Sequence, residues 1–597
     1  GIWGKELEMA KIKKILIANR GEIVLRIVRT IKEMNREAVV VYETPDRNAL
    51  YLRHVREAVL LGDGPRKDYL NIEKMIRAAC LTGADAIHPG YGFLAENADF
   101  AAACEREKII FIGPSPKVIA DMGNKVMARQ AIARTGIPTI PGTTKLSPDN
   151  TGIEEAVQFA SEVGYPVMLK ALAGGGGRGI RKVMNEGELR AAMPVARLEA
   201  LSAFNDESLY VEKCISPAKH VEVQILADQH GNVIHLGTRD CSIQRRNQKL
   251  LEVAPADLPR DVLEAIEDAA VRAARAVRYE NAGTFEFLVH PETHEFWFLE
   301  VNTRLQVEHT VTEILTGVDI VRQQILIAEG NPLELKQEHR RLQGRAIEVR
   351  INAEDPKNRF MPEGGKTVDR YQQPGGPGVR LDEFIYQGYH IPRDYDSLLA
   401  KITVRGHAWK QTVERLRRAL EDFLIVGPWT TIPLYISICN EPDFIEGRFD
   451  TSYIEGHPQV FDYEDPVPGY ARTDQSPRVI DLREEKTPLE HEKGPEKAVA
   501  ASLEREKSLR SSLTLPEIES LARIGDIRSP ISGTINQIYV EVGDYVEDGD
   551  ILLVMEAMKM HTQIVAEVNG TIAEIYAQEA GPVDFGQPIF KIRVDGD

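Results

Sequence analysis

The 597-residue sequence has few cysteines, fewer basic than acidic residues, and no apolar run of 18 residues. Its five cysteines lie far apart and form no Cys-x-x-Cys pair, which argues against a disulfide framework or a zinc site and favours a reducing compartment. The formal net charge of -18 disfavours binding to nucleic acid. Without a predicted membrane span or a signal-peptide pattern, we expect a cytoplasmic protein that binds no membrane.

The length predicts several domains, and the hydrophobic pattern changes along the chain. Residues 13 to 42 read as two apolar strands around a helical segment, and this alternation continues to about residue 120, which predicts a parallel α/β sheet. We expect this first domain to span residues 9–132. A smaller α/β segment follows at 133–212, and residues 213–457 carry more antiparallel signals.

Residues 458–523 are rich in proline and charge and poor in large apolar residues, which predicts a flexible linker. One part of it, Glu496 to Leu513, has the composition of a charged helix. A wholly flexible linker of about 60 residues would span roughly 40–50 Å on average.

The last segment, residues 524–597, contains a weak internal repeat. Gly533-Thr534-Ile535 recurs 37 residues later as Gly570-Thr571-Ile572. Two similar β-rich halves therefore flank residues 555–560, and Lys559 is expected at an exposed tip between them.

Lys559 is flanked by Met558 and Met560. The ordinary interpretation is a solvated surface lysine, but methionines are unusual in a tight turn and form an adaptable apolar surface. The run Glu556–Met560 resembles the biotinylation motif of biotin carboxyl carrier domains. Lipoyl domains share the two-half fold but lack the paired methionines, so biotin is favoured. The resemblance implies biotin in an amide bond to Lys559, attached by a biotin protein ligase.

A glycine-rich run, Gly174 to Gly179, follows an apolar strand that ends at Lys170. It matches G-x-G-x-x-G only weakly, because the next residues, Ile180 to Met184, read as a strand and not as the helix of a dinucleotide site. A hairpin loop whose backbone N–H groups close over phosphates fits better, and a merely flexible loop is the alternative.

Two acidic residues, Glu286 and Glu300, are each seven residues from Thr293, where the pattern predicts a hairpin turn. They should therefore lie opposite each other, with Glu300, Asn302 and Arg304 on one face. Two carboxylates and an amide oxygen suit a hard cation, Mg²⁺ or Mn²⁺, and without a cation the two anions would repel each other.

Together these features resemble an ATP-grasp enzyme, and more closely the biotin carboxylases of biotin-dependent carboxylases. The resemblance covers residues 13–457 and again 526–593. It implies an α/β ATP-grasp body with a Rossmann-like N-domain, an ATP-grasp lid and a mixed α+β C-domain, joined by the linker to an all-β flattened barrel of the biotinyl/lipoyl type. The matching motifs are 15–23, 88–97, 239–246, 302–309 and 350–355.

The resemblance implies that ATP phosphorylates bicarbonate to carboxyphosphate, which breaks down to CO₂ and phosphate, and that biotin is then carboxylated. It implies a metal site at Glu286, Glu300 and Asn302. The ATP contacts that it implies are Lys125, Lys170, Gly175, Gly176, Gly177, Glu212, Lys213, Ile215, His220, Gln244 and Asn247.

By the same resemblance, bicarbonate is held by Lys249, Arg304, Gln306 and the Val307 backbone. Glu308 is the implied general base, because a carboxylate flanked by cations can deprotonate bicarbonate, and Arg350 is implied to stabilise the enolate form of biotin. The sequence departs from some relatives, which have His in place of Asn247. It also has Leu251-Glu252-Val253 where many have two adjacent acids.

No carboxyltransferase domain is expected in this sequence, so the resemblance implies a separate carboxyltransferase (β) subunit and a homo-oligomer within an α/β complex. The expected acceptor is an acyl-CoA, acetyl-CoA or propionyl-CoA. Alternatives are a pyruvate carboxylase or decarboxylase complex, a non-catalytic carrier or scaffold, and another ATP-grasp ligase of the carbamoyl-phosphate-forming kind, which has no use for Lys559.

We expect Lys559→Arg to abolish biotin attachment without unfolding the rest of the chain, because the tip lysine lies outside the core. Streptavidin blotting of the purified variant measures this. A variant that still binds streptavidin would contradict the assignment of Lys559.

Overall fold

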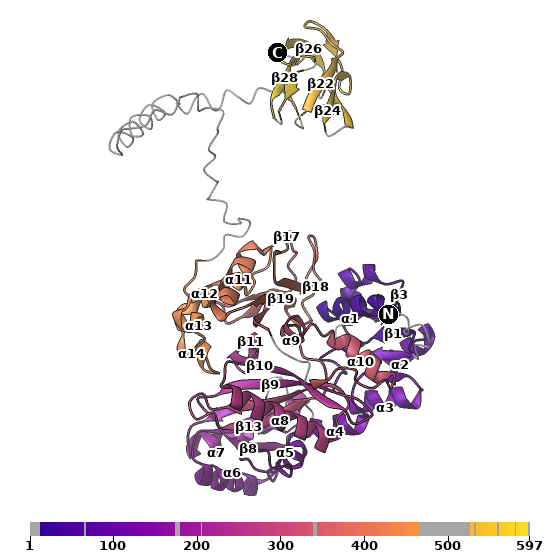
Figure 1. The fold of residues 1–597 in the computed structure, drawn as a ribbon. Coiled ribbons are helices and arrows are strands. Elements are labelled where there is room, and N and C mark those ends of the chain that lie inside the picture. Colours follow the sequence, from indigo (N-terminus) through magenta and orange to yellow (C-terminus); the bar gives the residue numbers. More distant parts are fainter. Residues whose placement is uncertain are drawn as a thin grey trace, which may run out of the picture. The chain divides into compact units, whose positions relative to one another are not determined.

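The computed structural model describes residues 12–64, 67–172, 179–204, 206–337 and 343–464, and a C-terminal part comprising 526–529, 533–557, 560–566, 568–579, 581–584 and 586–594. The chain divides into two compact units, Gly1–Ser476, here called the body, and Pro477–Asp597, here called the carrier unit (Figure 1). The predictions for Gly175, Gly176, Gly177, Lys559 and the helix at 496–513 lie outside the described residues.

The body begins with a parallel five-stranded sheet in the order β3-β2-β1-β4-β5. Ile23, Ile27 and Ile31 of the first helix are buried, which confirms the helical spacing read from the sequence. The elements are β1 (Lys14–Ile17), α1 (Glu22–Glu33), β2 (Glu37–Glu43), β3 (Glu57–Gly62), α2 (Ile72–Thr82), β4 (Ala86–His88), α3 (Ala98–Arg106), β5 (Ile110–Phe111) and α4 (Pro116–Gly123).

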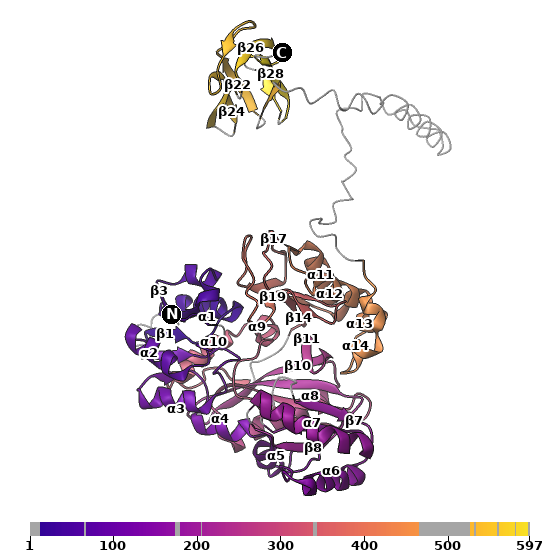
Figure 2. The same ribbon diagram turned by 180° about the vertical axis from the view of Figure 1, so that it is seen from behind.

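A small lid carries a three-stranded antiparallel sheet in the order β7-β6-β8. The pairing of β6 with β7 confirms that the glycine-rich run connects two strands of a hairpin. In both Figure 1 and Figure 2 the lid helices α6 and α7 lie at the end of the body remote from α11. Helix α5 (Lys125–Ala133) packs against β13 and α8 and precedes the lid, whose elements are α6 (Asn150–Val163), β6 (Val167–Ala171), β7 (Ile180–Val183), α7 (Glu186–Phe204) and β8 (Leu209–Lys213).

The rest of the body is built on one eight-stranded sheet in the order β13-β12-β9-β10-β11-β14-β19-β18. Neighbouring strands all run antiparallel, as the sequence predicts for this region. The strands are β9 (Lys219–Ala227), β10 (Val233–Arg245), β11 (Gln248–Ala254), β12 (Asn281–Val289), β13 (Phe296–Asn302), β14 (Arg345–Asn352), β18 (Val379–Glu383) and β19 (Leu398–Gly406).

Helices cover this sheet, and two short strand pairs, β15 with β16 and β17 with β20, extend the C-terminal part. None of the described helices is long and apolar enough to cross a membrane. The remaining elements are α8 (Arg260–Ala276), α9 (His309–Thr316), α10 (Ile320–Ala328), β15 (Glu354–Asp355), β16 (Met361–Pro362), β17 (Arg370–Gln372), α11 (Trp409–Asp422), β20 (Leu424–Val426), α12 (Ile432–Asn440), α13 (Pro442–Ile445) and α14 (Tyr453–Gly456).

The body continues beyond residue 457, where the sequence analysis placed the start of the linker. A short 3₁₀ turn, Pro458–Phe461, packs on the C-terminal core, with Val460 fully buried and Phe461 and Tyr463 lying against that core. The prediction failed because three apolar residues, Val460, Phe461 and Tyr463, form too short a stretch among Pro and polar residues to give a periodic signal.

The carrier unit consists of two four-stranded antiparallel sheets, ordered β21-β28-β26-β23 and β25-β24-β22-β27, around one apolar core. Strands β22 and β26 occupy equivalent places in the repeat. β24 ends at Ala557 and β25 begins at Met560, and these two residues pair, so the chain reverses between them. The strands are β21 (Asp526–Arg528), β22 (Gly533–Ile538), β23 (Tyr545–Val546), β24 (Ile551–Ala557), β25 (Met560–Val565), β26 (Gly570–Ile575), β27 (Pro582–Val583) and β28 (Pro588–Val594).

We predict that Val460→Asp lowers the free energy of unfolding of the body by more than about 4 kcal/mol, because it places a carboxylate in the C-terminal core. Gly456→Asp is the matched control, since a side chain there meets open space. Calorimetric scans of the full chain measure the effect, and equal midpoints for the two variants would show that residue 460 does not belong to the body.

Candidate functional site

One largely buried cation, the Lys249 ammonium, lies at the centre of the site. The Lys249 ammonium, on β11, is 2.6 Å from a carboxylate oxygen of Glu222, 2.9 Å from Glu286 and 2.7 Å from Glu308. Burial alone would lower the pKa of Lys249, but the surrounding anionic groups outweigh burial and hold this pKa well above its usual value. Lys249 therefore stays charged and balances three carboxylates that would otherwise repel one another.

Glu308 lies directly before α9 and is fully buried. Its two oxygens accept from different cations, Lys249 at 2.7 Å and Arg350 Nη2 at 3.0 Å. Burial raises the pKa of Glu308, but Lys249, Arg350 and Arg239 outweigh it and hold the pKa well below its usual range. The site thus keeps Glu308 ionised, so that it can accept a proton, between two positive charges that can attract an oxyanion.

Arg350, on β14, joins Glu308 to a second buried carboxylate. Its Nε donates to Glu252 on the neighbouring strand at 2.8 Å. Burial raises the pKa of Glu252 to about 7, even though Arg350 opposes the rise. One guanidinium therefore contacts one firmly ionised carboxylate and one that titrates near neutrality.

The predicted metal ligands come together as the sequence requires. Glu286 on β12 and Glu300 on β13 are direct cross-strand partners, and Asn302 Nδ2 donates to Glu286 at 2.7 Å. Lys125 lies 3.0 Å from Glu300, and His220 Nε2 lies 2.8 Å from Glu286. Two facing carboxylates and an amide form an oxygen-rich donor set that fits a hard divalent cation.

The segment after β13 carries the predicted anion ligands. Arg304 donates from Nε to Glu96 at 2.8 Å, from Nη1 to the Gln306 amide oxygen at 2.9 Å and from Nη2 to Asn302 at 3.2 Å. Gln306 in turn donates to Glu286 at 3.2 Å. Arg304 and Gln306 are thus hydrogen-bonded to the metal ligands Asn302 and Glu286, and Lys249 connects Glu286 to Glu308.

The predicted nucleotide contacts lie in three places. His220 Nδ1 lies 2.7 Å from the Gln244 amide, within the central cluster, and Lys170 lies in the lid, 2.5 Å from Glu212. Three other predicted contacts among the described residues lie outside the hydrogen-bonded cluster around Lys249. Lys213 is the last residue of β8, Ile215 follows β8, and Asn247 is exposed in the β10–β11 turn with φ +60.

Sequence reasoning missed several buried partners of these residues. Arg239 is fully buried and donates to Glu222, Gln224, Thr284 and Thr312. The available signal was the alternation of polar with apolar residues in β9 and β10, which puts these side chains on one face. The missing information was that both faces of these strands are buried.

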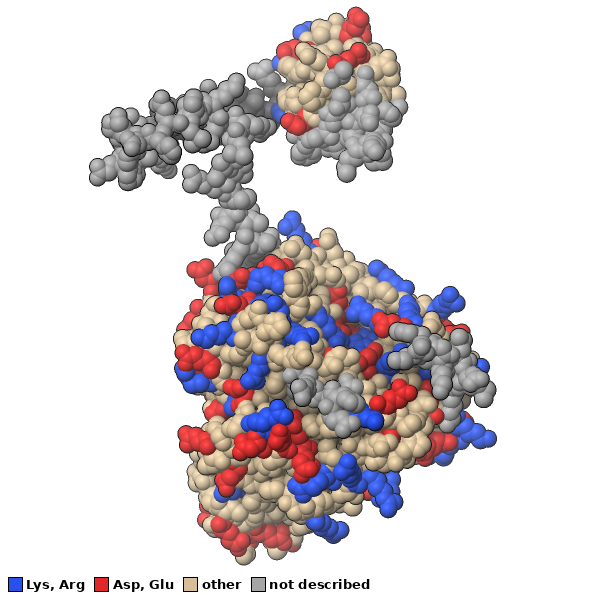
Figure 3. Space-filling model, viewed as in Figure 1, with Lys and Arg blue, Asp and Glu red and all other residues tan. Residues whose placement is uncertain are grey.

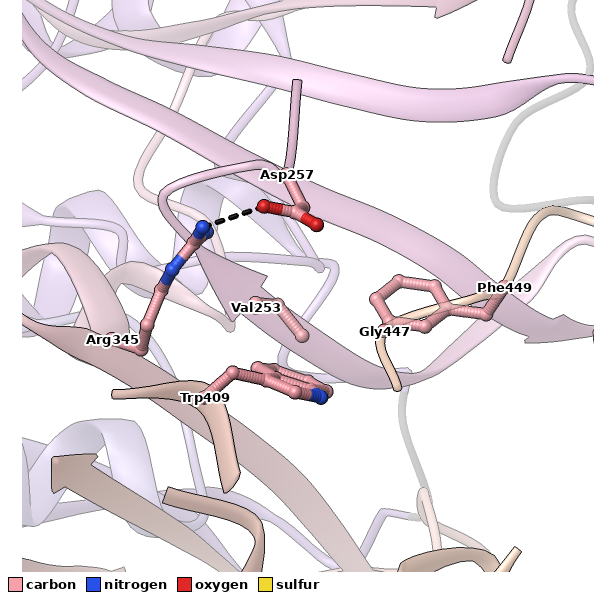
Figure 4. Close-up of a pocket in the computed structure, with 6 residues that line it drawn as sticks. All are labelled: Val253, Asp257, Arg345, Trp409, Gly447 and Phe449. Carbon is pink, nitrogen blue, oxygen red and sulfur yellow. Dashed lines mark hydrogen bonds and ion pairs between the residues drawn. The ribbon is translucent and has the colours of Figure 1, made fainter. Parts of the chain in front are cut away.

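A small cavity lies apart from the site. The cavity, drawn in Figure 4, is lined by Val253, Trp409 and Phe449 beside the Arg345–Asp257 ion pair, and it includes none of the predicted site residues.

On the face drawn in Figure 3, basic and acidic side chains of the body are interspersed. This mixed pattern differs from the clustered basic face of nucleic-acid-binding proteins.

Comparison with known proteins finds matches along most of the described chain. Family profiles match in the order "Biotin carboxylase, N-terminal domain" at 11–119, "Carbamoyl-phosphate synthase L chain, ATP binding domain" at 124–336, "Biotin carboxylase C-terminal domain" at 348–456 and "Biotin-requiring enzyme" at 525–592.

Individual relatives cover most of the body. Biotin carboxylase 1 of Bacillus subtilis is 48% identical over 446 residues, which are 74% of this chain and 98% of that protein. The 2-oxoglutarate carboxylase small subunit of Hydrogenobacter thermophilus is 49% identical over 452 residues, 76% of this chain and 95% of that protein.

A solved structure shows the same fold. The biotin carboxylase domain dimer of the Hydrogenobacter thermophilus 2-oxoglutarate carboxylase, in complex with MgADP, ADP and bicarbonate, has a TM-score of 0.74 at 48% identity. The match covers 76% of this chain and all of that chain.

The chain belongs to the biotin carboxylase family. It joins an ATP-grasp biotin carboxylase body to a biotin-requiring carrier unit, as the resemblance implied. The expected set of biotin, ATP, Mg²⁺ and bicarbonate is confirmed for this family.

The raised pKa of Glu252 predicts a pH effect on stability. Its folded value of about 7 exceeds the unfolded value of about 4.3, so ionisation of Glu252 opposes folding increasingly as the pH rises between these values. Glu252→Gln removes this loss. From pH 5 to pH 8, stability should shift in favour of the variant by on the order of 2–3 kcal/mol.

Denaturant unfolding of the wild type and Glu252→Gln across this pH range measures the shift. Glu264→Gln, at an exposed helical ion pair with Arg260, is the control and should parallel the wild type. Parallel curves for Glu252→Gln as well would contradict a near-neutral titration of Glu252.

Proposed function

We propose that this chain uses ATP and bicarbonate to carboxylate biotin carried on its own Lys559, and that a separate carboxyltransferase (β) subunit passes the carboxyl group to an acyl-CoA, acetyl-CoA or propionyl-CoA. The observation that carries the first step is the Glu308 carboxylate held between Lys249 and Arg350. A non-catalytic scaffold has no need of an ionised, buried carboxylate flanked by two cations.

In this proposal Lys249, Arg304, Gln306 and the Val307 backbone hold bicarbonate. Lys249 and Arg304 supply positive charge, and the arginine fork matches a planar oxyanion. Glu308, kept ionised by its cations, accepts the bicarbonate proton. Binding of the anion then requires Lys249 and Arg304 to exchange some of their present carboxylate and amide contacts for the substrate.

In this proposal the phosphates of ATP lie at the metal ligands. Glu286, Glu300 and Asn302 would hold Mg²⁺, which neutralises phosphate charge when bound. Lys125 and Lys170 lie where they can move from Glu300 and Glu212 to the nucleotide phosphates, because phosphoryl transfer depends mainly on positioning and charge stabilisation. His220 and Gln244 complete the nucleotide side of the cluster, with the 175–177 loop, Glu212 to Ile215 and Asn247 as further contacts.

The carrier unit would bring biotin to Arg350. Residues after 464, as far as about 523, serve as the tether, and a tether raises the local concentration of biotin, commonly into the millimolar range for flexible linkers. The Arg350 guanidinium offers positive charge to the ureido oxygen. A biotin protein ligase attaches the cofactor at Lys559, and the whole assembly works in the cytoplasm.

A second candidate for the acceptor of the carboxyl group is a 2-oxo acid. The relative from Hydrogenobacter thermophilus is named as a subunit of a 2-oxoglutarate carboxylase, which favours a 2-oxo acid as acceptor. The solved domain of that enzyme is a dimer, which supports a homo-oligomer of this chain within an α/β complex.

Purification of the chain with its bound partner subunit distinguishes the two acceptors. Labelled bicarbonate, ATP and one of acetyl-CoA, propionyl-CoA, pyruvate or 2-oxoglutarate are supplied, and acid-stable label is measured. Label fixed with an acyl-CoA supports the proposal. If label is fixed only when a 2-oxo acid is supplied, the acceptor is a 2-oxo acid and the acyl-CoA proposal is wrong.

We predict that Arg350→Ala lowers biotin carboxylation about 100-fold or more while the KM for ATP changes less than about threefold, because the guanidinium faces biotin and not the nucleotide. ATP hydrolysis that depends on free biotin and bicarbonate measures the rate of carboxylation and the KM for ATP. Arg345→Ala, on the same strand but paired with Asp257, is the control and should match the wild type. Undiminished carboxylation by Arg350→Ala would rule out this role.

A further inference from the structure

One face of the C-terminal strands is polar, charged and buried. The cross-strand pairs Arg350–Lys401 and Glu348–Thr403 join β14 to β19, and Lys401 also pairs with Asp382 on β18. Paired residues share a face, so these side chains form one row directed at α9 and the start of α1. Arg350 belongs to the proposed biotin site, whereas Lys401, beside it, has no role in the function proposed above.

Lys401 on β19 is fully buried and contacts two other parts of the body. Its ammonium donates to the carbonyl oxygen of Val307 at 2.6 Å and lies 3.3 Å from a carboxylate oxygen of Glu22. It also lies 5.8 Å from the ring centre of Tyr91, whose hydroxyl donates to Glu22. The N-terminal sheet region, the segment after β13 and the C-terminal strands therefore meet at one nitrogen atom.

A buried lysine is costly unless its charge is compensated and its donors are used. Burial alone would lower the pKa of Lys401, but Glu22, Glu348 and Asp382 outweigh burial and raise it. Lys401 therefore remains a cation. Its hydrogen bond to Val307 is charge-assisted, which makes it stronger than a bond between neutral groups.

The carbonyl of Val307 belongs to the peptide unit that leads to Glu308, and the amide of Val307 is a proposed bicarbonate ligand. A donor fixed to that carbonyl restrains the orientation of both. We infer that Lys401 is a positioning residue, which holds the Val307–Glu308 segment in the geometry needed for bicarbonate and does not itself touch the substrate. This inference rests on the proposed function.

The test separates positioning from fold stability. Lys401→Met removes the donor and leaves Glu22 as a buried anion, so it lowers stability as well as activity. In Lys401→Met/Glu22→Gln the carboxylate that is directly paired with the lost ammonium is neutralised as well, and most of the loss in the heat-unfolding midpoint should be recovered. Lys401→Arg restores a cationic donor. Bicarbonate-dependent ATP hydrolysis by the full chain with free biotin gives the KM for bicarbonate and for ATP.

We expect the double variant to show a KM for bicarbonate raised about tenfold or more with a KM for ATP within about twofold of the wild type, because the lost bond is to a charged group. Lys401→Arg should recover at least part of this loss. Arg20→Met, which removes a buried cation paired with Asp46 in the N-terminal region, is the control. It should lower stability without changing the KM for bicarbonate.

A double variant that regains both its midpoint and the wild-type KM for bicarbonate would overturn the inference, since Lys401 would then serve the fold alone. An equal rise in both KM values would overturn it as well. If Lys401→Met does not fold, the double variant and Lys401→Arg decide the question. Absence of bicarbonate-dependent hydrolysis in the wild type would instead reject the proposed function itself.

Discussion

The balance of charge around Lys249 is the constraint on which the rest of the site depends. One ammonium group contacts three buried carboxylates, and Arg350 contacts one of these together with a fourth, Glu252. Removing one partner of a buried ion pair typically destabilises a protein by about 3–5 kcal/mol. The cluster therefore cannot be read as a set of independent residues, and a substitution at any member changes the pKa of the others.

The antiparallel sheet makes this balance geometrically feasible. Lys249 on β11, Glu286 on β12 and Arg350 on β14 come from strands of one sheet, and Glu308 follows the hairpin that closes its edge. Main-chain hydrogen bonds fix the spacing of these strands, so the charges need no mobile loop to hold them in place. The lid contributes Lys170 and Glu212 from a separate small sheet.

Much of this arrangement could be predicted from local patterns. Counting from Thr293 placed Glu286 opposite Glu300, and the structure confirms the pair, with a one-residue shift of register between Glu286 and Phe287 that the sequence did not reveal. The glycine-rich hairpin was predicted from the strand patterns on both sides of the glycines, and the two halves of the carrier unit from the 37-residue repeat. Register is a short-range property that a single sequence can carry.

The parts of the site and fold that could not be predicted depend on contacts between segments that are distant in the sequence. Nothing near Lys401 in the sequence indicates that Val307 and Glu22 meet it, and the alternation in β19 equally suits a strand with one solvated face. The burial of Arg239 could not be predicted for the same reason. The extension of the body past residue 457 could not be predicted either, because Val460 packs on helices and strands that lie much earlier in the chain.

The central claim is that the site around Glu308 charges biotin on the same chain. The most direct measurement supplies ATP and radiolabelled bicarbonate to the biotinylated full chain, without any acceptor, and follows acid-labile label on the protein at neutral pH. The account predicts ATP-dependent label on the wild type and none on Glu308→Gln carrying the same amount of biotin. Equal labelling of the two proteins, or none on the biotinylated wild type, would contradict it.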